Sequence, residues 1–265
     1  MPQIEFDLEK GPRNRLSGLY AQIKELKARK GTIEKEIERT KSEIASFSPA
    51  PPHRQKASSQ KKKKTKWHEG YLHFTTSSGN LVVAGRNAKQ NDELVAKHLT
   101  ENDLFFHADI QGAPATILAG GKKALEAAKS GDGPASLSLK ETAQWAASYS
   151  SAWKTGASSV DVYALFSHQV SKHAPEGGSV GKGAFALTGE REWFRATPLG
   201  LKIGVENGAP CALPAIHPKQ LAKQALLFVG KSEKQEASKE LSSHLSFPME
   251  EIAPWLPSGK FSIKK

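Results

Sequence analysis

Three groups of polar side chains in this chain have the chemistry to contact a phosphate, a ribose hydroxyl or the edge of a base. They follow or precede apolar runs that read as strands, so each group is expected where a strand ends. The groups are Arg86, Lys89, Gln90 and Asn91; then His107, Asp109 and Gln111; and then His168, Gln169, Ser171 and Lys172.

The first two groups carry specific geometric expectations. The first lies where a strand passes into a helix, a place where free backbone amides and cations bind phosphate. Alternation along a strand would place His107, Asp109 and Gln111 on one face. Two alternatives stay open: His107 is a structural histidine with a satisfied hydrogen bond, or it faces a ligand. Aromatic residues nearby either stack on bases or belong to the core: Trp67, Tyr71, His73 and Trp193.

Catalysis is the competing interpretation of the same residues. His107 and Asp109, or His168 and His173, are possible acid–base or metal groups, but the histidines form neither an HxxxH nor an HExxH pattern. The glycine-rich segment 177–183 lacks the spacing of a phosphate-binding loop, and a strand rather than a helix is expected after it. We therefore expect no enzyme, no metal site and no cofactor.

The elements that position these residues are predicted from apolar periodicity. Strands are expected at 71–76, 81–84, 103–108, 115–118, 160–166, 184–188, 201–205 and 225–229, and helices at 87–98, 122–129, 138–153, 232–245 and 250–256. Strands and helices do not alternate regularly, which favours an α+β fold with a mixed or antiparallel sheet packed by helices. We expect a domain over 67–205 and a carboxy-terminal α/β extension over 206–265.

A long helix is predicted upstream of this domain, within residues 1–47. From Leu16 to Phe47 the apolar residues recur in alternating steps of three and four, with polar Lys30 and Thr40 in the gaps. Such a coiled-coil-type helix cannot bury its own seam, so it needs a second copy, a partner protein or a groove. The alternative is that it folds back on its own domain.

The excess positive charge is concentrated in the segment that follows the helix. The net charge is +11, and residues 48–68 carry 7 Lys/Arg and no Asp/Glu. The prolines in 48–52 end the helix, and 48–66 has no core-forming residue, so we expect a disordered basic linker. Its cations would bind a polyanion in a salt-sensitive manner: Lys61, Lys62, Lys63, Lys64 and Lys66. A solvating linker or a localisation signal is the alternative.

The remaining composition excludes some classes of protein. One cysteine, Cys211, allows no disulfide within the chain, as is typical of a reducing compartment. No run approaches the roughly 18 apolar residues of a membrane span. The amino terminus has no apolar signal core. We expect a cytoplasmic protein without a membrane partner.

Four segments in order resemble a known family. They are SSGNLVVAGRNAKQNDELVAKHL, DLFFHADIQGAPATIL, LKETAQWAASYSSAW and YALFSHQVSKHAPEGG. Together they are similar to the NFACT-R domain, the RNA-binding-type domain of the NEMF/RqcH/FbpA group, over roughly 67–205. The segment before residue 27 resembles the entry into that group's coiled coil. The chain departs from the family pattern in the loop 177–185 and at Asn14–Arg15.

The resemblance implies a part in ribosome-associated quality control. Members of this group bind obstructed large ribosomal subunits that carry peptidyl-tRNA, and they recruit aminoacyl-tRNA for untemplated carboxy-terminal tailing. The tRNA-reading NFACT-N module is not in this sequence, so we expect a separate NFACT-N polypeptide that pairs through the 14–47 helix. The expected partners are then the large ribosomal subunit, rRNA and tRNA. The alternatives are a coiled-coil protein–protein adaptor, a stand-alone NFACT-R nucleic-acid-binding protein and, last, a nuclease or hydrolase.

Overall fold

The structure is a computed structural model with two compact units, residues 1–63 and 64–265. It describes residues 66–173 and 180–265, together with residues 20, 23–31, 33–35, 37, 38 and 41. In the first unit, residues 23–31 are helical, and Ile23, Leu26, Ile33 and Ile37 are exposed. Residues 20, 33–35, 37, 38 and 41 are helical as well, and the other residues of the predicted 14–47 helix lie outside the described ones, as do the basic linker up to residue 65 and Lys61–Lys64.

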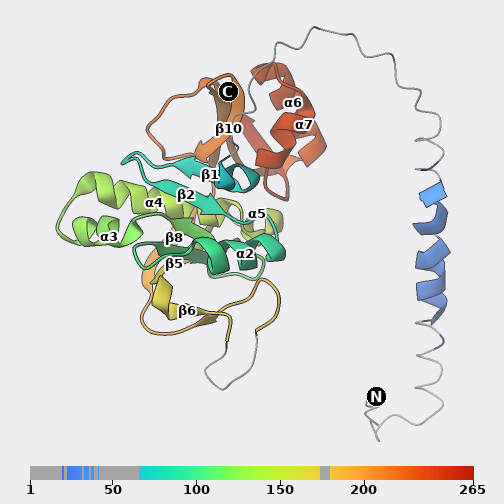
Figure 1. The fold of residues 1–265 in the computed structure, drawn as a ribbon. Helices are drawn as coiled ribbons and strands as arrows, with labels where there is room; N and C mark the ends of the chain where they lie inside the picture. Colours follow the sequence, from blue (N-terminus) through green and yellow to red (C-terminus); the bar gives the residue numbers. More distant parts are fainter. Residues whose placement is uncertain are drawn as a thin grey trace, which may run out of the picture. The chain divides into compact units, whose positions relative to one another are not determined.

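The second unit contains a six-stranded sheet in which every neighbouring pair is antiparallel (Figure 1). The predicted α+β class with an antiparallel sheet is confirmed. In spatial order the strands are β1 (Leu72–Thr75), β2 (Leu81–Ala84), β4 (Thr116–Leu118), β3 (Leu104–Ala108), β5 (Ser159–Phe166) and β8 (Glu192–Pro198). The strand β8 therefore forms one edge, next to β5.

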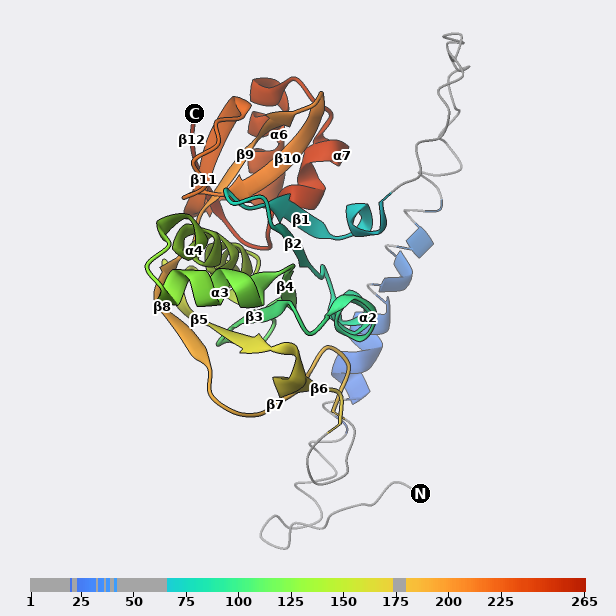
Figure 2. The same ribbon diagram turned by 60° about the vertical axis from the view of Figure 1, so that its left-hand side comes forward.

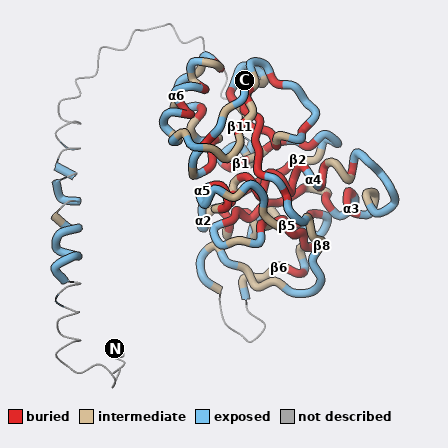
Figure 3. Tube along the Cα trace, turned by 180° about the vertical axis from the view of Figure 1, so that it is seen from behind, coloured by how far each residue is buried: buried red, intermediate tan, exposed pale blue. Residues whose placement is uncertain are grey.

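Helices cover the two faces of this sheet. On one face α4 (Gly133–Ser148) packs Trp145 into a core with Phe106 of β3 and Phe194 of β8, beside α3 (Gly121–Lys129). Figure 3 shows the buried residues gathered around this helix and the strands. On the other face Phe105 and Leu165 pack with Val95 of α2 (Ala88–His98). The short strands β6 (Val170–Ser171) and β7 (Ala186–Leu187) pair beside them.

A second, four-stranded antiparallel sheet continues the same core. Its spatial order is β10 (Ala209–Pro214), β9 (Leu201–Glu206), β11 (Ala222–Ser232) and β12 (Phe261–Lys264). The helices α6 (Lys234–Leu245) and α7 (Met249–Ile252) lie beside it (Figure 2). Leu201, Leu227 and Leu241 belong to the apolar cluster that contains Trp145. The sheet begins at Leu201, so it extends across the 205/206 division expected from the sequence.

Several elements differ from those predicted. The single helix expected over 138–153 is wrong: α4 ends at Ser148, and a second helix α5 (Ser151–Thr155) follows. Ser150 separates them because its hydroxyl caps α5 at the amide of Ala152. Asp132 caps α4 and starts it earlier than expected. The strands β8, β10 and β12 were not predicted, and three short 3-10 turns lie at Trp67–Gly70, Ser167–Gln169 and Ala253–Trp255.

Within the described part of the chain, no helix has both the length and the apolar character needed to cross a bilayer.

Candidate nucleic-acid interface

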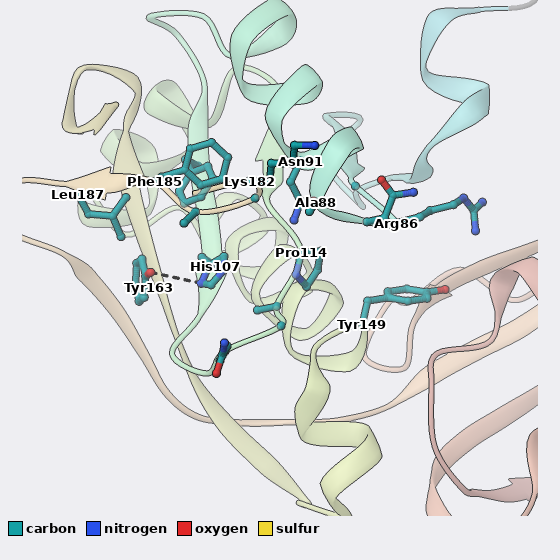
Figure 4. A pocket seen from close by; sticks show the side chains of 18 residues that line it. Arg86, Ala88, Asn91, His107, Pro114, Tyr149, Tyr163, Lys182, Phe185 and Leu187 are labelled. Atoms are coloured by element: carbon teal, nitrogen blue, oxygen red, sulfur yellow. Dashed lines mark hydrogen bonds between the residues drawn. The ribbon is translucent and has the colours of Figure 1, made fainter. Parts of the chain in front are cut away.

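A cavity of about 560 Å³ lies where the amino end of α2, the end of β3 and the segment 182–187 meet (Figure 4). Lys182 and Asn91 lie on one side of it, and His107 lies on its floor. Phe185, Tyr163 and Leu187 form an apolar and aromatic wall. The cavity therefore joins residues that are almost a hundred positions apart in the sequence.

Two residues of the first predicted group hold the local fold. The Gln90 side chain accepts from the Arg86 amide and donates to the Gly70 carbonyl, so both its ends are engaged inside the protein. Asn91 is buried and its Oδ1 accepts from the Ala115 amide at 3.2 Å. A β-carbon on Gly85 would meet that same Oδ1 at 2.1 Å, so the position of Asn91 depends on a glycine there. Asn91 still lines the cavity.

The two cations of that group behave differently. The Arg86 guanidinium turns away from the cavity and donates to the carbonyls of Pro254 and Tyr71, with Trp255 as a cation–π partner at 5.8 Å. Burial lowers the pKa of Arg86. Lys89 is exposed and makes no hydrogen bond or ion pair with any described residue. Lys89 is thus the cation of the group that is free for a ligand.

The second group does not form the single strand face that was predicted. The strand β3 ends at Ala108, and Asp109 and Gln111 lie in the bend that follows it. The Asp109 amide still bonds to the Asp161 carbonyl in the register of the ladder, but the Ile110 amide turns back to the Ala108 carbonyl, so the chain leaves the strand before Gln111. His107 and Gln111 still meet at the cavity, whereas the Asp109 side chain is exposed elsewhere.

The His107 imidazole is both structural and part of the cavity. Its Nδ1 faces the Tyr163 hydroxyl at 3.3 Å, and its ring stacks with Phe105 at a centroid distance of 6.1 Å. Burial lowers the pKa of His107, so the ring is neutral near pH 7. A neutral imidazole has one donor nitrogen and one acceptor nitrogen, so it can form a hydrogen bond with a polar ligand without adding a charge to the site.

The third group lies outside the cavity lining. Gln169 is buried and donates to the carbonyls of Thr188 and Glu190, and the Ser171 hydroxyl accepts from the His173 amide. His168 is exposed and stacks on Phe166 at 5.8 Å. Lys172 donates to the carbonyls of Gly181 and Ala184. Gln169 and Lys172 are therefore committed to internal contacts.

Three cations near the cavity, Lys182, Arg191 and Arg195, were not predicted from the sequence. Lys182 lies in the lining of the cavity. On the edge strand β8, Arg195 lies 3.8 Å above the Trp193 ring, and Arg191, the residue before β8, lies 4.5 Å above the Tyr163 ring. The signal was present in the alternation of Arg191, Trp193 and Arg195, which places all three on one face of a strand. It went unused because β8 was not predicted.

The other predicted contacts have mixed surroundings. Lys66 is exposed at the start of the domain. Trp67 is about half exposed and stacks on His98 at 3.7 Å, whereas Tyr71 is buried in the core. His73 packs against Trp255. Of the aromatic residues singled out, Trp67 is exposed, His73 and Trp193 are half-buried, and only Tyr71 is buried.

The electrostatic character of the cavity is positive. Its described lining contains the cation Lys182 but no Asp or Glu, whereas the Arg86 guanidinium turns away from it and His107 is neutral. The amino end of α2 opens at Ala88, and the helix dipole adds partial positive charge there. The nearby Asp92 carboxylate is neutralised by Lys172 at 2.7 Å. Such a site favours an anion next to an aromatic surface.

Comparison with known proteins bears on this site. Residues 70–189 match the model of the NFACT protein RNA binding domain. The chain is an NFACT-R domain protein. Its cavity lies wholly within the matched residues.

Relatives of this NFACT-R domain protein are larger than the matched region. The archaeal Rqc2 homolog aRqcH of Methanocaldococcus jannaschii is 34% identical over 223 residues, which are 80% of this chain and 32% of that protein. The ribosome quality control complex subunit NEMF of Homo sapiens is 30% identical over 135 residues, 51% of this chain and 12% of that protein. A solved structure, the C-terminal part of a fibronectin/fibrinogen-binding protein from Streptococcus suis, covers 71% of this chain and 77% of that one at 20% identity and a TM-score of 0.38.

Proposed function

We propose that this NFACT-R protein is an RNA- and ribosome-binding factor of ribosome-associated quality control, without a catalytic step of its own. It binds obstructed large ribosomal subunits that carry peptidyl-tRNA and supports tRNA recruitment for carboxy-terminal tailing, together with a polypeptide that supplies an NFACT-N module. Such a factor acts in the cytoplasm. The observation that carries the proposal is the match of residues 70–189 to an RNA binding domain.

The named relatives support the choice of process. The archaeal and human proteins that share this domain are named as an Rqc2 homolog and as a ribosome quality control complex subunit. The chain matches only a part of each, so the activity of the whole relative is carried over here as a proposal.

The surface chemistry supports RNA as the ligand. Lys89 and Lys182 flank the amino end of α2, Arg195 lies on the edge strand β8, and Arg191 directly precedes that strand. Guanidinium groups stacked on aromatic rings present flat donors that bind phosphates and stack on bases. The cations of the basic segment with Lys61–Lys64 would bind phosphates whatever the RNA sequence and without a fixed geometry. They would therefore raise the affinity for RNA and make that affinity more dependent on salt.

The amino-terminal helix is proposed as the contact for the partner polypeptide. Its described apolar side chains Ile23, Leu26, Ile33 and Ile37 are between 47% and 63% exposed. A stripe of that kind is stabilised when a second helix covers it.

Binding to ribosomes and to RNA tests the proposal. We expect the full chain to co-sediment with large ribosomal subunits and to bind tRNA with an affinity that falls steeply as salt is raised. Replacing Lys61–Lys64 with alanine is expected to reduce the salt slope of log affinity by about 0.7 to 0.9 per lost phosphate contact. An unchanged slope would show that the basic segment makes no RNA contact.

A protein–protein adaptor is the second candidate, and the exposed helical stripe is the observation that favours it. Deletion of residues 1–47 separates the two. Ribosome association survives the deletion if the NFACT-R domain binds RNA, and it is abolished if the helix alone makes the contact. The RNA-binding proposal also requires the deletion variant to bind tRNA.

A further inference from the structure

The cavity is built for one unpaired nucleotide. We propose that it takes a nucleoside monophosphate unit, with the phosphate at the amino end of α2 and the base against the wall formed by Phe185 and Tyr163. The inference rests on the proposed RNA-binding function, because it names the part of the RNA that this site would accept. A free mononucleotide and an unstacked nucleotide within an RNA share this chemistry.

The phosphate end is defined by donors that the fold leaves open. Asn87 caps α2 by accepting from the Gln90 amide, and the amides of Ala88 and Lys89 form no hydrogen bond with a described residue. Two open amides at the positive end of an eleven-residue helix bind an anion well. Lys182 stands beside them in the cavity lining and has no ion pair among the described residues.

Asn91 is an independent sign of a ligand. Its side chain lines the cavity although the residue is only 7% exposed. Its Oδ1 is fixed by the Ala115 amide, but its Nδ2 donates to no described residue. The protein thus holds this side chain by its oxygen alone, and the amide donor is accessible to a polar group in the cavity.

The opposite wall suits a base. Phe185 and Leu187 supply apolar surface, and Tyr163 adds a ring. His107 and Gln111 supply polar atoms at the floor and rim for the edge of a base. The volume of about 560 Å³ lies within the range of roughly 300 to 1,000 Å³ that small-ligand sites occupy. A single nucleotide fits, whereas a stacked duplex does not enter such a space.

The segment after residue 180 holds the cavity in shape. The Gly183 amide donates to Asp92 Oδ1 at 3.0 Å, and φ at Gly183 is +75°. A β-carbon there would lie 2.8 Å from the β-carbon of Ala88. Only glycine allows the segment to approach α2 this closely, so the site is preformed rather than assembled on binding.

The test uses the full chain and four probes that dissect the ligand. AMP, CMP, adenosine and inorganic phosphate are titrated, with binding followed by the NMR shifts of the Ala88 and Lys89 amides. We expect the mononucleotides to bind at least about tenfold more tightly than adenosine or phosphate, since the two ends of the site then act together. Equal affinity for mononucleotide and phosphate would reduce the site to a simple anion site and overturn the inference.

Two variants locate the binding. Asn91→Asp keeps the acceptor for Ala115 while it replaces the open donor with a negative charge, and Lys182→Ala changes an exposed side chain that holds no described contact. Each should weaken mononucleotide binding about tenfold. Lys140→Ala, an exposed lysine of α4 outside the cavity, should leave it unchanged. If Asn91→Asp lowers the melting temperature, Lys182→Ala alone decides.

Binding of tRNA, measured on the same variants, separates the inference from the proposed function. Salt-dependent tRNA binding that persists without any mononucleotide binding overturns the cavity inference and leaves the proposed function standing. Mononucleotide binding without tRNA binding supports the cavity as a site for a free nucleotide and overturns the proposed function. Weakened binding of both ligands by Lys182→Ala supports an RNA nucleotide in the cavity.

Discussion

Lys172 Nζ lies 2.7 Å from Asp92 Oδ1, and this ion pair connects the end of β6 with α2 across eighty residues of the sequence. The same lysine donates to the carbonyls of Gly181 and Ala184, and the same carboxylate oxygen accepts from the Gly183 amide. One pair of side chains thus holds the segment that closes the cavity.

We expect Lys172→Met to weaken the fold rather than the RNA contact directly. The substitution removes the ammonium that lies 4.9 Å above the Phe185 ring, pairs with Asp92 and donates to the carbonyls of Gly181 and Ala184. The side chains of the pair are 29% and 28% exposed, so part of the loss is regained by hydration. The free energy of unfolding, measured with urea, should fall by about 1 to 2 kcal/mol.

Lys182→Met is the matched control, since it removes a lysine from the same segment. Its side chain is exposed and has no described partner, so the unfolding midpoint should stay where it is. Its tRNA affinity should fall instead. If the two variants unfold at the same urea concentration, the ion pair does not hold the segment.

Arg195 of β8 and Arg191, which precedes it, should each contribute about one phosphate contact to RNA binding. Arg191→Ala and Arg195→Ala each remove an exposed guanidinium, and each should lower tRNA affinity about threefold to tenfold at moderate salt. The slope of log affinity against log salt should fall by roughly 0.7 to 0.9 per variant. Fluorescence anisotropy over a salt series measures both.

Lys140→Ala serves again as the control for loss of one positive charge. A drop in affinity equal to that of the arginine variants would mean that net charge alone, and not the β8 edge, governs binding. Arg195 also pairs with Asp161 at 2.6 Å, but the Arg195 side chain is 61% exposed and that of Asp161 is 37% exposed, so stability should change little.

The sequence predicted the elements whose apolar pattern is regular. β2 was predicted with the bounds that it has, and α2 was expected from the cap at Asn87. β8 was missed because its pattern is interrupted at Ala196, where φ is +47° and the pairing with β5 shifts register. β12 is short and only Phe261 in it is buried, so it gave little apolar signal.

The site could be predicted only in part, for a different reason. Polar residue types indicate which side chains can bind RNA, but they do not show which of them are already engaged. Gln169 and Lys172 have the donors of an RNA contact, yet backbone carbonyls already occupy those donors. Gln169 donates to the carbonyls of Thr188 and Glu190, and Lys172 donates to those of Gly181 and Ala184. The cavity itself arises from long-range packing of the segment 182–187 against α2, which no local pattern encodes.

Arg86 should stabilise the fold by joining the segment before the first strand to the carboxy-terminal part of the unit. Its guanidinium bonds to the carbonyls of Tyr71 and Pro254, and the Tyr149 hydroxyl donates to the neighbouring Trp255 carbonyl at 2.7 Å. Arg86→Met should lower the free energy of unfolding by about 1 to 3 kcal/mol because two carbonyls lose a charged donor. Lys89→Met, on the adjacent exposed position, should lower tRNA affinity without that loss. The reverse pattern would make Arg86 the RNA contact.

Burial of His107 should make stability depend on pH below neutrality. The pKa of His107 is lowered from 6.5, chiefly by desolvation, so below pH 6.5 the unfolded chain binds a proton that the folded protein still excludes. The free energy of unfolding should therefore fall as the pH drops from 6.5 toward the folded pKa, by at most about 1.4 kcal/mol per pH unit for this group. Burial also lowers the pKa values of His68, His98 and His217, so they add losses of the same sign. His107→Asn removes one contribution, and urea unfolding between pH 7.5 and about 5 should show a shallower decline. Parallel curves for the variant and the natural protein would mean that His107 takes up its proton as readily in the folded cavity as in the unfolded chain.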